Sequence, residues 1–418
     1  RTSSAAGVRS SDLIETLQDH GFQVLCVSPS RLNEHTELLA REHDVQCVQA
    51  DANTDTFQKL LLETSPQLVL FDRFIAEEMY GWQAKKYAPE AARVLDLQDV
   101  HFLRKAREFL VKKQGVPFRQ TLDMRTLDVD AVEKQVVREL AAIHRCDLTL
   151  YVSDAEKDAL TNRFQVDGDA LHCCDFFYPP PQSADLLPTF TERKDIAFVG
   201  SFKHPPNVDA IEWIKAAILP VFREANDDAE IHVYGSYANT ARYSKLDDAK
   251  QGFRLRGFAP NVHDTLRQYR LTVAPLRFGA GIKGKIADSW LVGTPCVSTS
   301  IGAEGMTLPL SAEKTQLQDQ WGGLIADEPA AFAAAMQSLY VDEAKWRVAQ
   351  GAGLEICRGR YDRERNASAL MQRLESVLLQ KQTLRRDNWV GKILWSEKFR
   401  ATEYMSRFIR AKNDKVAP

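Results

Sequence analysis

The residues best suited to chemistry lie in one glycine-rich stretch, GAGIKGKIADSWLVG, at residues 279–293. Glycines let a loop approach a ligand more closely than a Cβ would allow, and loop amides followed by a helix N-terminus favour an anion. Lys283 and Lys285 add mobile cations suited to a diphosphate. Asp288 follows one helical turn later, on the same side of the helix, where a carboxylate can accept hydrogen bonds from both hydroxyls of a ribose. The stretch therefore predicts a nucleotide site.

Two simpler interpretations of this stretch stay open. A glycine-rich loop of this kind also serves merely to cap a helix. An isolated acid such as Asp288 is often only a solvated surface group. The residues themselves do not decide between these interpretations and a nucleotide site.

The loop must be positioned by the elements around it, and these alternate between short apolar runs and helical patterns. Such alternation is typical of parallel sheets covered by helices on both faces, and so predicts an α/β fold. The expected strands are 22–28, 45–50, 67–72, 92–97, 147–153, 170–177, 195–201, 230–236, 253–258, 271–276, 294–300 and 323–327. The clearest helical stretches between them are 10–20, 55–64, 131–145, 207–225, 261–269, 284–292 and 329–349.

A linker divides the chain into two halves. At 418 residues the chain is too long for one ordinary core. The pattern breaks near 178–194, which begins Tyr-Pro-Pro-Pro, and proline is stiff and cannot continue a strand ladder. We therefore expect two doubly wound Rossmann-like domains, at 1–182 and 190–380, with a helical extension at 381–418.

Charge and composition exclude some functions. The net charge of −3 gives no global basic field, so we expect no nucleic-acid partner. No run approaches the roughly 20 apolar residues of a membrane span. The seven cysteines lack the spacing of metal ligands, so we expect no metal site. Their pattern favours buried thiols in a reducing compartment, so we expect a cytoplasmic protein.

The segment 384–413 differs from the rest, because it mixes large apolar side chains with many basic ones. The pattern favours an amphipathic helix. Two roles stay open for it: packing on the body of the protein or on a partner, and peripheral contact with a membrane surface.

Beyond these residues, the second half resembles the group 1 glycosyltransferases of the family 4 type, which have the GT-B fold of two facing Rossmann-like domains. The matching blocks are IAFVGSFKHPPNVDAIEWI (196–214), VYGS (233–236), LRGFAPNVHDTLRQYRLTVAPLRFGAGIKGK (255–285) and GTPCVSTSIGAEGM (293–306). The resemblance implies binding of a nucleotide sugar after the APLRFGAG block, and transfer of its sugar with retained configuration, without a metal.

The resemblance also implies roles for individual residues. Lys283, and with it Lys285, would neutralise the diphosphate leaving group, and Asp288 would hold the ribose where the family usually has a glutamate. Glu304 either faces the sugar or ribose or is an ordinary acid of a surface turn. The other positions in the donor-binding blocks are Gly200, Ser201, Lys203, Gly235, Gly279, Ala280, Gly281 and Ile282.

Two of these positions depart from the family pattern. Ala280 stands where the family often has a second acid near the sugar, so we expect main-chain amides or another side chain to contact the sugar. The family's usual arginine after Gly200 is missing, and Lys203 or His204 is the expected replacement.

The first half resembles the family less closely. Residues 3–29 look like the opening glycine loop, helix and second strand, with Gly7 as the remaining loop glycine and Arg9 placed to reach a phosphate. The strand that should precede this loop is missing from the sequence. His101, after VLDLQDV, fits a catalytic histidine that contacts the donor sugar, with Asp99 and Arg104 beside it.

A further match, at DLTLYVSDAEKDAL (147–160), ends a strand at Ser153. Ser153 with Glu156 three residues later predicts a capping box. In the family this strand end borders the cleft, so Ser153 is also a weak candidate on the acceptor side.

The predicted function is transfer of a hexosyl unit from a UDP- or GDP-sugar to an acceptor hydroxyl that the sequence does not identify: a glycan, a lipid-linked glycan or a protein. His101 and Lys283 are the expected catalytic residues, and no cofactor is expected beyond the donor. The alternatives are a nucleotide-sugar epimerase and a non-catalytic nucleotide-sugar-binding or scaffold protein on the same fold. A dinucleotide oxidoreductase is disfavoured, because no GxGxxG follows a strand.

Overall fold

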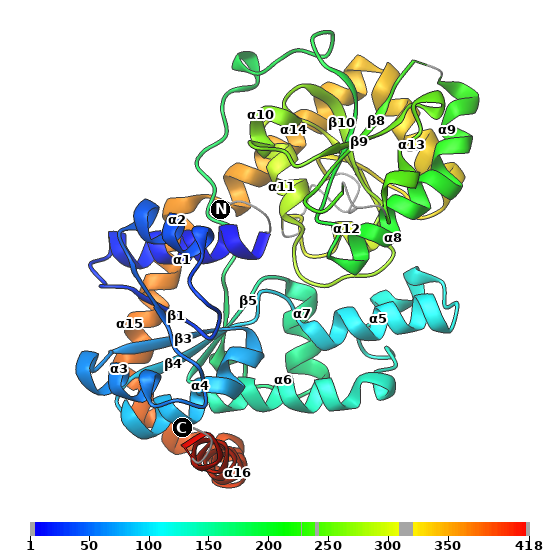
Figure 1. Ribbon diagram of the computed structural model, residues 1–418. Helices are drawn as coiled ribbons and strands as arrows, with labels where there is room; N and C mark the ends of the chain where they lie inside the picture. Colours follow the sequence, from blue (N-terminus) through cyan, green and yellow to red (C-terminus); the bar gives the residue numbers. More distant parts are fainter. Residues whose placement is uncertain (1–4, 227, 239–241, 309–320, 415–418) are drawn as a thin grey trace.

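A computed structural model describes residues 5–226, 228–238, 242–308 and 321–414, and these form two α/β domains (Figure 1). Each domain has parallel strands covered by helices, as the alternation of apolar runs predicts. Each also has its own apolar core: one is built around Phe198, Ile231 and Val273, and the other around Phe71, Leu95 and Leu160.

The C-terminal domain contains one six-stranded parallel sheet in the order β12-β11-β10-β7-β8-β9. Numbered from β7, this is the doubly wound order 3-2-1-4-5-6, in which ligands bind where the order reverses, at the carboxyl ends of the central strands. That point lies between β7 and β10. The strands are β7 (Lys194–Val199), β8 (Ile231–Tyr234), β9 (Phe253–Gly257), β10 (Tyr269–Ala274), β11 (Cys296–Ser298) and β12 (Gly323–Ile325).

The helices of this domain follow its strands in sequence and cover the sheet. They are α8 (Pro205–Trp213), α9 (Leu219–Ala225), α10 (Val262–Leu266), α11 (Gly284–Leu291), α12 (Ser300–Ala303), α13 (Pro329–Val341) and α14 (Glu343–Arg360). The single helix expected over 329–349 is wrong: it ends at Val341, and Asp342 caps a new helix by accepting a hydrogen bond from the amide of Lys345.

In the N-terminal domain the described strands form two separate parallel sheets, β1-β2 and β3-β4-β5-β6. In the doubly wound order the first strand would lie between β1 and β3. The split between the two described sheets therefore falls at the position of that strand. The strands are β1 (Leu25–Ser28), β2 (Gln46–Gln49), β3 (Leu68–Asp72), β4 (Ala92–Asp96), β5 (Leu148–Tyr151) and β6 (Leu171–Cys173).

The helices of this domain are α1 (Ala5–Asp19), α2 (Glu34–His43), α3 (Thr56–Thr64), α4 (Arg73–Tyr87), α5 (His101–Lys113), α6 (Glu133–Arg145) and α7 (Asp154–Asp158). The first of them begins five residues before the expected start at residue 10. Gly7 consequently lies in the first turn of α1, and its predicted place in an open phosphate loop is wrong.

Two long helices end the described chain. The first, α15 (Arg363–Asp387), returns to the N-terminal domain, where Leu370, Leu374 and Val377 pack against Val94 and Leu150 of its sheet. The domain division predicted from the sequence instead assigns residues 363–380, which are part of α15, to the C-terminal domain. The second, α16 (Trp389–Asp414), lies on the side of the N-terminal domain away from the other domain (Figure 1). Within the described ranges, the helices lack the combined length and apolarity needed to span a bilayer.

Candidate functional site

The glycine-rich loop lies between the end of β10 and the start of α11, at the switch point of the C-terminal sheet. At Gly281 the backbone has φ +64°, and a Cβ there would lie 2.9 Å from the Cβ of Asp99 in the other domain. Glycine is thus required twice, for its conformation and for the approach of the two domains. The loop forms part of the domain interface.

Two lysines follow this turn in positions suited to an anion. The Lys283 Nζ is buried and donates to the carbonyl of Gly281 at 2.6 Å. The Lys285 Nζ donates to Asn207 Oδ1 at 2.6 Å and lies 4.3 Å from the ring centre of Phe198. Burial lowers the pKa of Lys283 to about 8, against the opposing charge of Glu304, and lowers the pKa of Lys285 to about 7. An arriving diphosphate would favour the charged form of both lysines.

The N-terminal domain contacts this loop through a residue that the sequence analysis did not identify as part of the site. Arg107 of α5 is fully buried and donates to both carboxylate oxygens of Glu304, each at 2.7 Å. It also donates to the carbonyl of Gly279 at 2.8 Å. Glu304 therefore forms a buried ion pair between the domains, and its interpretation as an ordinary surface-turn acid is wrong. The partners are 197 residues apart, so no local pattern could have paired them.

A second carboxylate, that of Glu156, also joins the domains. Its Oε1 accepts hydrogen bonds from the amides of Val100 and Gly281, both at 2.8 Å. Its Oε2 is buried without a hydrogen-bond partner. Burial raises the pKa of Glu156 to about 7 despite these bonds. Glu156 thus binds a loop amide that, according to the sequence-based prediction, would bind the donor.

The capping box predicted for Ser153 and Glu156 is wrong. The Ser153 hydroxyl makes no cap hydrogen bond and is buried without a partner, and the Glu156 carboxylate binds the amides of Val100 and Gly281 instead of that of Ser153. Ser153 does border the interface, since a Cβ on Gly305 would lie 2.3 Å from its Oγ.

His101 begins α5 and faces the same interface. Its Nε2 lies 3.2 Å from Asp99 Oδ1, and Arg104 donates to Asp99 Oδ2 at 2.6 Å. Burial opposes ionisation of Asp99, but the bond from His101 and the charge of Arg104 outweigh it and hold the pKa of Asp99 below its ordinary value. The Arg104 Nη1 also lies 3.4 Å from His204 Nε2 of the C-terminal domain.

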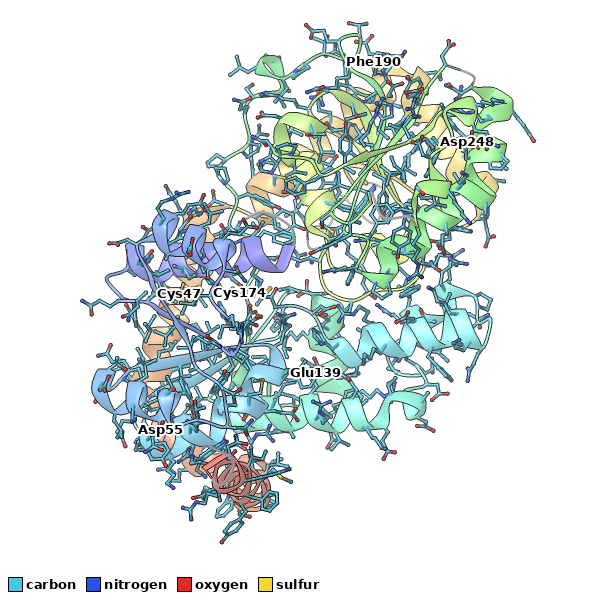
Figure 2. The ribbon with its side chains drawn as sticks, in the orientation of Figure 1. Cys47, Asp55, Glu139, Cys174, Phe190 and Asp248 are labelled. Carbon is cyan, nitrogen blue, oxygen red and sulfur yellow. The ribbon has the colours of Figure 1, made fainter. Side chains whose placement is uncertain are left out.

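The first turn of α5 is held in place by Glu139 of α6 in the N-terminal domain (Figure 2). Glu139 is fully buried, and its two oxygens accept hydrogen bonds from the amides of His101 and Phe102, both at 2.9 Å. Burial raises the pKa of Glu139 to about 8. This carboxylate fixes the position of His101, and sequence reasoning missed it because it lies on a helix 38 residues away.

Asp288 lies on α11, partly exposed, as the ribose prediction requires. Its Oδ1 accepts hydrogen bonds from the Tyr178 hydroxyl at 2.8 Å and from His263 Nε2 at 3.0 Å. Burial opposes the charged form of His263, but the bond to Asp288 raises its pKa. Tyr178 lies at the start of the linker and His263 lies in the first turn of α10, and the sequence did not identify either as a partner of Asp288.

The remaining predicted donor residues lie at the carboxyl ends of β7 and β8. A Cβ on Gly235 would lie 2.0 Å from the carbonyl oxygen of Gly200, and one on Gly200 would lie 2.6 Å from Asn207 Cγ. Both glycines are therefore needed for close packing beneath the site. Ser201 Oγ accepts a hydrogen bond from Ser236 at 3.2 Å. The exposed Lys203 Nζ lies 3.7 Å above the ring of Tyr237.

Two loop residues supply apolar contacts. Ala280 packs against the core of the N-terminal domain, which explains an apolar residue where the family often has an acid. Ile282 packs against a cluster of its own domain that contains Ile286 and Trp290.

The prediction that Arg9 reaches a phosphate is wrong. Its Nε and Nη2 donate to the buried carboxylate of Asp96 at 2.7–3.1 Å, and its Nη1 donates to the carbonyl of Cys174 at 2.6 Å. Each guanidinium nitrogen thus already has an acceptor. Arg9 joins α1 to β4 and to the chain after β6.

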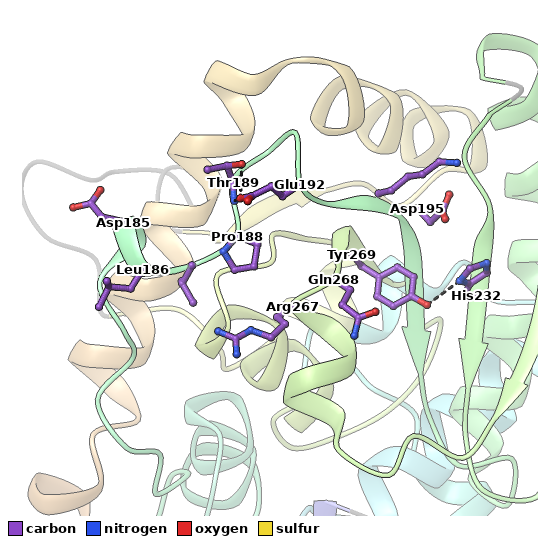
Figure 3. A pocket seen from close by; sticks show the side chains of 12 residues that line it. Asp185, Leu186, Pro188, Thr189, Glu192, Asp195, His232, Arg267, Gln268 and Tyr269 are labelled. Carbon is purple, nitrogen blue, oxygen red and sulfur yellow. Dashed lines mark hydrogen bonds between the residues drawn. The ribbon is translucent and has the colours of Figure 1, made fainter.

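A surface pocket of about 890 Å³ lies elsewhere, beside the linker (Figure 3). Lys194 and Tyr269, which line it, are the first residues of β7 and β10, so the pocket is at the amino ends of the strands. Nucleotides bind at the carboxyl ends in this architecture. The pocket is therefore not the predicted donor site.

No group of three or more His, Cys, Asp or Glu side chains placed to hold a metal ion occurs within the part of the chain that the structure describes. Independence from metals stays a prediction.

The comparisons with known proteins agree with this geometry. The family Glycosyl transferases group 1 matches residues 193–342. A search of curated proteins found no match.

Many solved structures share the fold. Sucrose-phosphate synthase from Thermosynechococcus elongatus has a TM-score of 0.65 at 13% identity, over 90% of this chain and 94% of that one. HepE from Anabaena, in complex with UDP and glucose, has a TM-score of 0.63 at 12% identity, over 90% and 98%.

TarM from S. aureus, as a mutant bound to fondaparinux, α-GlcNAc-glycerol and UDP, has a TM-score of 0.56 at 12% identity, over 76% of this chain. This chain spans only 57% of the length of TarM. The predicted GT-B architecture is confirmed, and residues 193–342 match the family Glycosyl transferases group 1.

Proposed function

We propose that this protein transfers a hexosyl unit from a UDP- or GDP-sugar to an acceptor hydroxyl, with retained configuration and without a metal. The observation that carries the proposal is the pair Lys283 and Lys285 on the loop at the switch point of a group 1 glycosyltransferase domain. HepE, with which the chain shares its fold, binds UDP-glucose, so a UDP-sugar is the first donor to test.

In the proposed reaction, the bond between the anomeric carbon of the sugar and the diphosphate oxygen breaks. Negative charge develops on the leaving diphosphate, and Lys283 and Lys285 stabilise it together with the loop amides. The acceptor hydroxyl forms the new bond on the face that the diphosphate leaves, and passes its proton to a phosphate oxygen. In this proposal His101, which is in contact with Asp99, binds the sugar from the N-terminal domain.

The donor must first part the loop from the N-terminal domain. The amide of Gly281 is taken by Glu156, and Glu304 is taken by Arg107. We infer that the diphosphate replaces Glu156 at the loop amide as the domains separate. The phosphate oxygens are acceptors of the same kind, so the amide keeps a partner throughout.

A nucleotide-sugar-binding protein without transfer is the second candidate, favoured by the apolar packing of Ala280 in place of an acid. Titration calorimetry with UDP and GDP detects binding in either case. Proton NMR of a mixture with donor sugars and simple glycoside acceptors separates the two, because only a transferase forms a new anomeric signal.

In the same NMR experiment, a retaining enzyme gives a product anomer that matches the donor. We expect EDTA to leave the rate unchanged. An inverted product, or a rate lost in EDTA and restored by Mg²⁺, would overturn the mechanism. The acceptor class and the expected cytoplasmic location remain proposals.

A further inference from the structure

The terminal helix α16 exposes an apolar stripe along its outer face. Trp389, Ile393, Tyr404 and Phe408 are separated by four, eleven and four residues, which places them on one side of a helix. Each is more than 60% exposed: 69%, 63%, 67% and 66%. We call these four residues, with the exposed Val390 and Met405 beside them, the outer stripe.

The opposite face of the same helix is firmly attached to the protein. Trp395 is buried, and its indole nitrogen donates to the carbonyl of Arg145 at the end of α6 at 3.2 Å. Ser406, eleven residues later, is also buried. Glu403 accepts a hydrogen bond from Lys86 of α4 at 2.9 Å. The outer stripe is thus presented outward by a helix whose inner face already has its partners.

The charge of this segment opposes that of the rest of the chain. Residues 384–413 carry eight Lys and Arg against three Asp and Glu, whereas the whole chain has a net charge of −3. Arg407 and Lys412 are exposed next to the outer stripe, Arg407 in an ion pair with Glu403 at 2.6 Å, and the Lys392 Nζ lies 3.8 Å above the ring of Trp389. Cations and aromatic rings beside an apolar stripe are the combination that favours an anionic lipid surface.

We propose that the outer stripe docks α16 flat on a bilayer that contains anionic lipid. The apolar side chains enter the boundary between headgroups and acyl chains, while Arg407 and Lys412 remain at the level of the headgroups. A partner protein is disfavoured because α16 itself carries six Lys and Arg against three Asp and Glu, and lipid phosphates attract this positive excess. The inference does not depend on the proposed transfer reaction.

The test is sedimentation of the full chain with vesicles of phosphatidylcholine alone and of phosphatidylcholine with phosphatidylserine. We expect binding to the anionic vesicles, weakened by salt. The variant Trp389→Ser/Ile393→Ser/Phe408→Ser should lower the bound fraction at least about tenfold. The matched control, Leu62→Ser/Val341→Ser/Val348→Ser, removes equally exposed apolar side chains from α3, α13 and α14 and should bind like the wild type.

Trp389 supplies a readout on the unmodified protein. The seven tryptophans all lie within the described residues, and Trp389 is the one whose side chain is largely exposed to solvent. An aqueous quencher should therefore act mainly on Trp389, and anionic vesicles should protect it. The proposal is overturned if anionic vesicles neither bind nor protect, if neutral vesicles bind as well, if the stripe variant binds normally, or if light scattering shows that the stripe instead joins two copies of the chain.

Discussion

The two domains of this protein differ at corresponding positions of their sheets. In the C-terminal domain the first strand, β7, lies in the middle of a continuous six-stranded sheet, and the glycine-rich loop lies at the reversal next to it. In the N-terminal domain the described strands fall into two sheets, which part where a first strand would lie. The C-terminal domain therefore holds the glycine-rich loop on one continuous sheet.

The two domains also contribute different residues to the candidate site. The C-terminal domain supplies the lysines and the loop, which are close together in sequence. The N-terminal domain supplies Arg107, Glu139 and Glu156, which are scattered in sequence and converge only through the fold. The residues of the C-terminal domain could be read from a motif, whereas those of the N-terminal domain are brought together only by contacts between distant parts of the chain.

The largest expected effect tests whether the domains close on each other as described. Arg107→Met leaves Glu304 buried without its cation, which should lower the free energy of urea unfolding by roughly 3–5 kcal/mol. The double variant Arg107→Met/Glu304→Leu should recover part of this loss, because both charges are then gone.

As a control, Arg347→Met removes an exposed pair with Glu343 on α14 and should change stability by less than about 1 kcal/mol. If Arg107→Met is as stable as the wild type, the two domains do not meet at this ion pair in solution.

The next effect tests the donor half alone. Lys283→Ala removes a cation from the leaving diphosphate and should lower kcat/KM by about 10²–10³-fold. Lys250→Ala, an exposed lysine before β9, is the control and should leave the rate unchanged. Steady-state kinetics with the preferred donor decide, and an unchanged rate for Lys283→Ala would remove its assigned role.

A third effect tests the N-terminal side of the interface through pH. The pKa of Glu156 rises from 4.5 to about 7 in the folded state, so the folded protein holds a proton that the unfolded chain releases. Stability should therefore fall as pH rises from about 4.5 to about 7.

Glu156→Gln keeps the acceptor oxygen but does not ionise, so it should lose less stability over this range, by roughly 1–3 kcal/mol. Urea unfolding at the two ends of the range measures the difference. Parallel losses in both proteins would show that Glu156 is ionised throughout.

The smallest effect tests the ribose contact. Asp288→Asn weakens an acceptor of ribose hydroxyls, so the affinity for UDP should fall about tenfold, while that for inorganic pyrophosphate stays the same. Calorimetry with both ligands makes the comparison. An equal loss for both would assign Asp288 to the diphosphate or to folding.

Much of the fold could be predicted from the sequence. All twelve expected strands occur, because apolar runs between turn residues read clearly. The start of α1 was placed too late, since Ala5, Ala6 and Gly7 resemble a loop motif but continue the helix. The helix over 329–349 was predicted unbroken because the apolar pattern runs past the cap at Asp342.

The site was predictable only where its residues are neighbours in sequence. Lys283, Lys285 and Asp288 share one loop and helix, so their spacing carried information. Arg107 and Glu139 gave no signal, because a charged residue on an amphipathic helix reads as exposed until its partner is known. Arg9 was misjudged for the same reason, since its acceptor Asp96 lies 87 residues away.

The most direct test of the central claim is a crystal structure of the protein with UDP. We expect the diphosphate within hydrogen-bond distance of Lys283 and Lys285, the ribose on Asp288, and Gly281 released from Glu156. A nucleotide bound in the pocket beside the linker, or a loop still closed on Glu156 with no nucleotide at the switch point, would contradict it.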